Sequence, residues 1–198
     1  FNSNIIHNCY EDKYFMDEEK FNSIKDDFRK TEEKKSSIIV VGLKKSRENN
    51  KGFDTFEKVF KKISINAEVI GVSCSKSNFI SKTFGTIDSL RIRELYFLAD
   101  LCIVFSRSET FSQVCLESLM CGTPVIAYGS NGPGDILQKS RQGLQLNHYS
   151  PEEFKTQIEK NLSLKKKEFI SYKELSSFRK FFDPEEISHE YLKEYKRQ

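Results

Sequence analysis

Short, mostly apolar runs alternate along this chain with segments whose apolar residues recur at helical spacing. The runs are the expected strands, at 38–41, 69–72, 101–105, 124–127 and 143–146. Runs without polar alternation are typical of parallel strands that are covered on both faces. The expected helices lie at 17–29, 52–63, 88–98, 112–120 and 151–162, and two more follow, the last beginning at 183. This alternation predicts an α/β fold: a single Rossmann-like, doubly wound parallel sheet with right-handed crossovers and C-terminal helices.

Length and composition restrict the class of protein further. With 198 residues, the chain can bury one good core and hardly two, so we expect one domain. Its net charge of +3 arises from mixed Lys and Glu, which predicts no nucleic-acid partner. No apolar run approaches the ~20 residues that a membrane-spanning helix needs. Five cysteines without C-x-x-C spacing indicate a reducing compartment and neither a disulfide framework nor a zinc site, so we expect a cytoplasmic domain.

The most informative stretch is residues 106–135, SRSETFSQVCLESLMCGTPVIAYGSNGPGD. Glu109 and Glu117, with seven residues between them, lie near the start of the expected helix 112–120. Ligands of doubly wound sheets bind outside the carboxyl ends of the strands, which is where Glu109 falls. A helix N-terminus there offers backbone N–H groups to an anion. Two carboxylates roughly 12 Å apart along a helix fit a ligand whose phosphates lie between two polyols, although two glutamates alone at this spacing are usually solvated surface.

This ordering resembles the nucleotide-sugar site of retaining glycosyltransferases of the GT-B fold, family 4 (glycosyl transferases group 1). Their pattern reads roughly S-x-x-E-x-F-x-x-x-x-x-E-x-x-x-x-G-x-P-V-I. The residues that match it are Glu109, Phe111, Glu117, Gly122, Pro124, Val125 and Ile126. The resemblance implies that Glu117 binds the ribose and that Glu109 binds the transferred sugar and acts in catalysis. It also implies that the helix start at Phe111, Ser112 and Gln113 binds the diphosphate.

The resemblance further implies positive charge at the diphosphate, since this architecture usually works without a metal. Lys51 with Gly52 matches the family's K-G pair, so Lys51 is expected to bind the diphosphate and to act in catalysis. Leu43 follows the first strand where the family has an arginine. In the loop beyond it, Lys45 has the better spacing from Lys51, whereas Arg47 offers a rigid fork that suits phosphate oxygens, and both remain candidates. No metal and no cofactor are expected besides the nucleotide-sugar substrate.

Two more segments fit the family pattern loosely. Gly132, Asp135 and Ile136 match a G-G-x-x-E/D-I sequence, which predicts either a wall of the donor cleft or a structural turn with Asp135 capping a short helix. Residues 84–87 resemble the segment beside the nucleobase. The three histidines are dispersed, so no Ser-His triad is indicated.

The resemblance covers nearly the whole chain but only half of a GT-B enzyme. Residues 1–16 resemble the interdomain connector, with Cys9 where the family has glycine. We expect an N-terminal acceptor domain, missing from this chain, to be a partner and to provide any membrane association. The C-terminal helix within 183–198 is expected to pack on that domain, which predicts partial exposure of apolar residues here: Ile187, Tyr191, Leu192 and Tyr195.

The expected function is therefore the donor-binding half of a retaining glycosyltransferase. Its parent would move a sugar from a nucleoside-diphosphate sugar to a glycan or lipid-linked acceptor, as in polysaccharide biosynthesis, and this chain alone should be inactive. A GT-B-type nucleotide-sugar epimerase is one alternative. A non-catalytic nucleotide- or carbohydrate-binding module is the other; Cys9 and Leu43 favour it, whereas both glutamates and Lys51 weigh against it.

Overall fold

The computed structural model describes residues 17–23, 35–129, 132–163 and 171–196 of the chain. Within this part, six parallel strands form one sheet in the order β3-β2-β1-β4-β5-β6. The strands are β1 (Ser36–Val41), β2 (Ala67–Val72), β3 (Lys82–Phe84), β4 (Leu101–Val104), β5 (Val125–Tyr128) and β6 (Gly143–Leu146). This is the strand order of a doubly wound Rossmann sheet, so the predicted fold class is confirmed.

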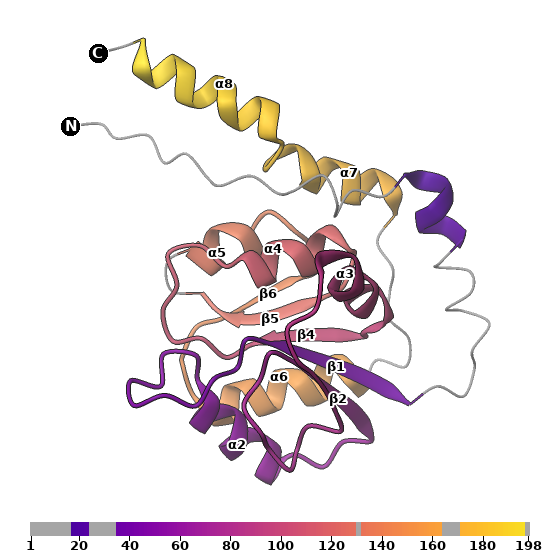
Figure 1. The fold of residues 1–198 in the computed structure, drawn as a ribbon, viewed down its shortest axis with the longest axis vertical. Coiled ribbons are helices and arrows are strands. Elements are labelled where there is room, and N and C mark those ends of the chain that lie inside the picture. The colour runs from indigo at the N-terminus through magenta and orange to yellow at the C-terminus, as the bar shows by residue number, and fades with distance from the viewer. Residues whose placement is uncertain (1–16, 24–34, 130–131, 164–170, 197–198) are drawn as a thin grey trace.

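Helices cover both faces of this sheet. They are α2 (Phe53–Lys62), α3 (Ser89–Leu98), α4 (Gln113–Met120), α5 (Gly132–Leu137), α6 (Pro151–Ser163), α7 (Tyr172–Lys180) and α8 (Pro184–Tyr195). Figure 1 shows α2 and α6 on one face and α3, α4 and α5 on the other, with α7 beyond α4 and α8 extending away from the sheet.

The central strands are apolar throughout because successive side chains point alternately into two cores, one on each face of the sheet. Ile38 and Val40 of β1 pack with α2 and α6, while Ile39 between them packs with α3 and α4 on the opposite face. A strand whose two faces are both covered has no solvent side on which polar residues would be favoured. The apolar run 38–41 therefore leads directly to the central position of β1 in the sheet.

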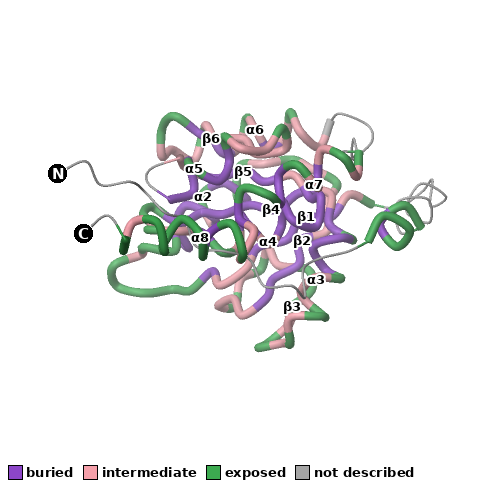
Figure 2. Tube along the Cα trace, turned by 90° about the horizontal axis from the view of Figure 1, so that it is seen from above, coloured by how far each residue is buried: buried purple, intermediate pink, exposed green. Residues whose placement is uncertain are grey.

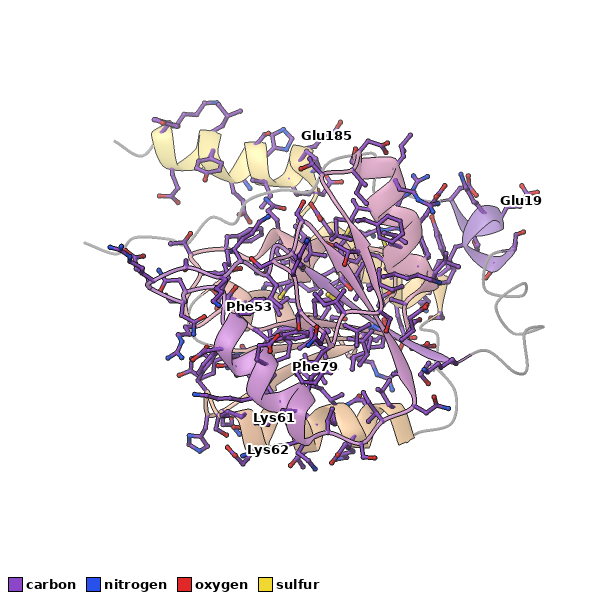
Figure 3. All side chains as sticks on the ribbon, turned by 60° about the horizontal axis from the view of Figure 1, so that its bottom comes forward. Glu19, Phe53, Lys61, Lys62, Phe79 and Glu185 are labelled. Atoms are coloured by element: carbon purple, nitrogen blue, oxygen red, sulfur yellow. The ribbon has the colours of Figure 1, made fainter. Side chains whose placement is uncertain are left out.

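Phenylalanine dominates the core on the α2 side. Phe56 and Phe60 of α2 lie with their ring centroids 4.7 Å apart, and Phe56 meets Phe105 edge-on at 5.6 Å. Figure 3 marks Phe53 near the start of α2 and Lys61 and Lys62 at its opposite end. Cations at the C-terminal end of a helix interact favourably with the helix dipole. This packing holds the start of α2 against the end of β4.

One strand was not predicted, and one short helix begins earlier along the chain than predicted. The edge strand β3 was not predicted, because two of its three residues are exposed and the third is half-buried, so the strand contains no apolar run. The helix α5 begins at Gly132 and contains Asp135, so Asp135 lies exposed inside the helix rather than at its cap. Glycine and proline at 132–134 had favoured a turn.

The last helix is exposed along most of its length, as Figure 2 shows. Tyr191, Leu192 and Tyr195 are 43%, 53% and 74% exposed, which confirms their prediction, whereas Ile187 at 6% is buried and its prediction was wrong. Asp183 caps the helix by accepting from the backbone N–H groups of Glu185 and Glu186. Of the described helices, none is long and apolar enough to cross a membrane. The predicted connector 1–16 and the end of the predicted helix 17–29 lie outside the described residues.

Candidate functional site

The site lies where the strand order reverses, between β1 and β4. From β1 the chain proceeds outward to β2 and β3 and then returns to place β4 on the other side of β1. The loops that follow the two central strands consequently diverge around a crevice, which is the ligand position of such sheets. The backbone N–H of Arg107, after β4, donates to the carbonyl of Asn50, in the loop after β1, at 2.8 Å. This bond brings the two loops together.

Gly52 lies where the loop after β1 comes closest to the segment after β4. Its φ of 71° is in the left-handed region, and a Cβ atom at this position would lie 1.9 Å from the carbonyl oxygen of Phe105. The hydroxyl of Tyr149 donates to that same oxygen at 2.7 Å. Only glycine combines this φ with this contact at low cost. The glycine of the K-G pair thus sets Lys51 beside the end of β4.

Lys51 forms an ion pair with Glu109. The Nζ atom of Lys51 lies 2.6 Å from Oε1 of Glu109, and the hydroxyl of Ser106 donates to the same oxygen at 2.7 Å. The Glu109 side chain is only 13% exposed, whereas Lys51 is 50% exposed. Two residues 58 positions apart, both predicted as catalytic, are therefore in direct contact at the switch point.

Glu109 is surrounded by donors that favour its charged form. Burial alone would raise the pKa of this carboxyl, but hydrogen bonds with Lys51, Ser106 and Ser112 outweigh it and hold the pKa below its usual value. Glu109 is consequently ionised at neutral pH. A carboxylate in this state can only accept hydrogen bonds, as a site for sugar hydroxyls requires.

This depressed pKa predicts a measurable dependence of stability on pH. The ionised carboxylate stabilises the folded chain above the unfolded pKa of about 4.5, and this contribution is lost as pH falls through the lower folded pKa. Glu109→Gln should therefore lose less free energy of unfolding than wild type between pH 7 and about pH 3. Denaturant titrations at both pH values test this. Glu190→Gln, on an exposed part of α8, should behave like wild type, and a Glu109→Gln variant as acid-sensitive as wild type would contradict the prediction.

The helix α4 begins one residue later than predicted, at Gln113. Ser112 is its N-cap, and its hydroxyl accepts from the backbone N–H of Cys115 at 3.4 Å. Glu109 lies before the helix rather than on it, in a segment that α5 fastens: the N–H of Gly132 donates to the carbonyl of Glu109 at 3.2 Å. Phe111 packs its ring against Phe182 at 6.2 Å. The helix start, Glu109 and Lys51 therefore lie together beyond the carboxyl ends of the central strands.

Glu117 lies further along α4 and is partly buried. The hydroxyl of Tyr96, on α3, donates to its Oε2 atom at 3.2 Å. Glu117 and Glu109 are consequently held by different partners, Glu109 by the loops at the crevice and Glu117 by the neighbouring helix.

The position of the family's arginine is occupied by Leu43, whose side chain is 3% exposed and belongs to the core on the α2 side. Leu43 cannot supply charge to a ligand. Beyond it, the backbone N–H of Lys45 donates to the hydroxyl of Ser75 at 2.9 Å, and the side chains of Lys45 and Arg47 are exposed. Both cations remain candidates, because neither is fixed on the site by a side-chain contact that would distinguish them.

Four residues that the sequence did not single out form a cluster that supports the loop carrying Lys51. Arg107 lies with its guanidinium carbon 4.8 Å from the centroid of the Tyr149 ring and pairs with Asp54 at 3.2 Å. Asp54 in turn accepts a hydrogen bond from the side chain of Asn49, in the loop before Lys51. No spacing in the sequence indicates this cluster, because its members come from three different segments of the chain.

The segment 84–87, expected beside a nucleobase, is fastened to the end of β2. Ser73 donates its backbone N–H to the carbonyl of Phe84 at 2.9 Å and its hydroxyl to the carbonyl of Gly85 at 3.3 Å. This places the segment beyond the carboxyl end of β2, on the side of the switch point away from β5.

The chain is similar to proteins of known class. Residues 23–175, more than half of the chain, match the family model described as glycosyl transferases group 1. The D-inositol 3-phosphate glycosyltransferase 2 of Catenulispora acidiphila is 32% identical over 72 residues, which are 36% of this chain and 17% of that protein. The D-inositol 3-phosphate glycosyltransferase of Rhodococcus opacus is 34% identical over 73 residues, 37% of this chain and 16% of that protein.

Solved structures match over almost the entire chain. Sucrose-phosphate synthase from Thermosynechococcus elongatus superposes with a TM-score of 0.73 at 18% identity, covering 97% of this chain and 51% of that one. Anabaena HepE, in complex with UDP-glucose, gives a TM-score of 0.71 at 16% identity, covering 98% of this chain and 57% of that one. The chain thus spans about half the length of these structures, and at this identity the likeness shows a shared Rossmann-like GT-B fold.

The residues that the family model matches include all six strands, β1 to β6. This chain belongs to the glycosyl transferases group 1 family.

Proposed function

We propose that this chain binds a nucleoside-diphosphate sugar and is the donor-binding domain of a retaining GT-B glycosyltransferase of family 4. Its parent transfers the sugar to a glycan or lipid-linked acceptor held by an N-terminal domain. The observation that carries the proposal is the contact of Lys51 with Glu109 at the switch point, beside the start of α4. The UDP-glucose bound to Anabaena HepE and the names of the matched relatives support a nucleotide-sugar donor.

Lys51 and the start of α4 are the proposed diphosphate-binding groups. Negative charge develops on the diphosphate as it leaves the sugar, and a cation and backbone N–H groups already in place stabilise that charge. Lys51 reaches the site from a loop that Gly52 and Arg107 fasten to β4. Lys45 or Arg47 supplies a second cation from the exposed loop after Leu43. These groups provide the needed positive charge, so we propose binding without a metal.

The two glutamates are the proposed acceptors for hydroxyl groups. Glu109, ionised at neutral pH, accepts from the transferred sugar, and Glu117 accepts from the two ribose hydroxyls. In the free chain Lys51 is paired with Glu109, so each charge has a partner of opposite sign. Donor binding then gives Lys51 a second anionic partner and gives Glu109 hydroxyl donors, so both residues gain interactions without either charge being left unpaired.

Calorimetry with UDP, GDP and ADP tests this function on the purified chain. We expect one nucleotide to bind, and Glu117→Gln to weaken it at least tenfold, since replacing a charged hydrogen-bond acceptor for a diol costs about 1.5–3 kcal/mol. Glu159→Gln, on the outer surface of α6 where it pairs with Lys155, is the matched control and should bind like wild type. Failure of all three nucleotides to bind the wild-type chain would refute the proposal.

A further inference from the structure

Tyr96 is a fully buried tyrosine whose hydroxyl meets the carboxylate of Glu117. Its side chain has 0% exposure, and its hydroxyl donates to Oε2 of Glu117 at 3.2 Å across the contact between α3 and α4. We propose that Tyr96 is a positioning residue that orients Glu117 for the ribose of the donor. This inference rests on the proposed function and assigns part of it to a residue that does not touch the ligand.

The tyrosine is held rigidly enough to perform this role. Its ring lies in the core formed with α4 and the sheet. Its backbone carbonyl accepts from the hydroxyl of Thr123, which is itself fully buried, and the Thr123 carbonyl accepts from the hydroxyl of Ser118 at 3.3 Å. The last turn of α3 is thereby tied to the turn that ends α4. Ring and backbone are both fixed relative to the helix that carries Glu117.

A fixed donor matters because a glutamate side chain is flexible. A carboxylate that accepts two hydrogen bonds from a vicinal diol must hold its plane in one orientation, and ordering a glutamate on binding costs conformational entropy. A hydrogen bond formed before the ligand arrives removes part of that cost. The Tyr96 hydroxyl also requires a partner in its own right, since a buried hydroxyl without one is strongly disfavoured. One bond therefore satisfies the core and preorganises the site.

The competing explanation is that the hydroxyl only joins α3 to α4. Both explanations predict a small loss of thermal stability in Tyr96→Phe, so stability does not separate them. They differ in what they predict for ligands with and without ribose hydroxyls. An orienting role affects only ligands that use the Glu117 carboxylate, whereas a general loosening of the helices affects all ligands alike.

The experiment compares Tyr96→Phe with wild type by calorimetry, using UDP, GDP or ADP, whichever binds most tightly, and its 2′,3′-dideoxy analogue. We expect the variant to bind the natural diphosphate about tenfold more weakly and the dideoxy analogue unchanged. Adding Tyr96→Phe to Glu117→Ala should cause no further loss, because the two changes remove one interaction. Tyr172→Phe, which removes a tyrosine hydroxyl from α7, is the control and should leave both affinities unchanged.

Equal weakening of both ligands, or no weakening of either, would overturn the inference while leaving the proposed function intact. A wild-type chain that binds no nucleoside diphosphate would overturn the proposed function and this inference with it. The two failures are distinguishable because the wild-type titration is read independently of the variant.

Discussion

Gly52→Ala is expected to lower the free energy of unfolding by about 2–5 kcal/mol. About 1–2 kcal/mol of this comes from placing a non-glycine residue in the left-handed region, and about 1–3 kcal/mol comes from overpacking. The reason is that the new methyl group would lie 1.9 Å from the Phe105 carbonyl oxygen and 2.5 Å from the Tyr149 hydroxyl. The backbone must move to relieve these contacts, and Lys51 moves with it. Denaturant unfolding measures the first effect, and weakened nucleotide binding measures the second.

Gly42 provides the matched control for this change. Its φ of 66° is nearly that of Gly52, but no atom lies within 4 Å of the position that a Cβ would take. Gly42→Ala should therefore cost only the backbone part, about 1–2 kcal/mol. The difference between the two variants isolates the close approach of Gly52 to β4. Equal losses would mean that this approach does not matter.

Lys51→Ala is expected to weaken binding of the nucleoside diphosphate about a hundredfold, because a hydrogen bond to a charged group contributes roughly 1.5–3 kcal/mol. The substitution also leaves Glu109 partly buried without its cation. The pKa of Glu109 should then rise, because burial continues to raise it while the hydrogen bond from Lys51 is gone. Calorimetry measures the affinity, and an NMR titration of the carboxyl measures the pKa.

Lys62→Ala is the control for the loss of a cation. Lys62 lies at the far end of α2 and pairs with Glu152, and both side chains are more than half exposed. Surface pairs of this kind contribute little, so binding should not change. If Lys51→Ala binds the diphosphate as tightly as Lys62→Ala does, Lys51 has no role in diphosphate binding.

The fold was largely predictable because the strands of a doubly wound sheet carry a strong local signal. The runs at 38–41 and 101–105 are apolar since β1 and β4 lie at the centre with both faces covered. β3 lies at the edge of the sheet. Its three residues are neither an apolar run nor covered on both faces, so they gave no such signal. The start of α5 was misplaced because its glycines suggest a turn, although Gly132 is required there by its close approach to the Thr110 carbonyl.

The site was predictable in its residue types but not in its contacts. Glu109, Glu117 and Lys51 were named as candidates because they match the family pattern near a strand end, a helix start and a glycine. The supporting residues Arg107 and Asp54 were not, since they are 53 positions apart and neither belongs to a local pattern. Leu43 stands where the family pattern has an arginine. The sequence did not explain this difference, whereas the structure places the Leu43 side chain in the core.

By itself, the sequence determined the doubly wound class and most of the strands and helices, because these depend on periodicity and on neighbours along the chain. Its resemblance to the family pattern supplied the candidate site residues. The tertiary structure alone decided which of these residues meet. The ion pair of Lys51 with Glu109 and the bond of Tyr96 to Glu117 span 58 and 21 positions. Their formation depends on the order of the strands in the sheet and on how α3 packs on α4. Such long-range packing produces no periodic pattern in a single sequence.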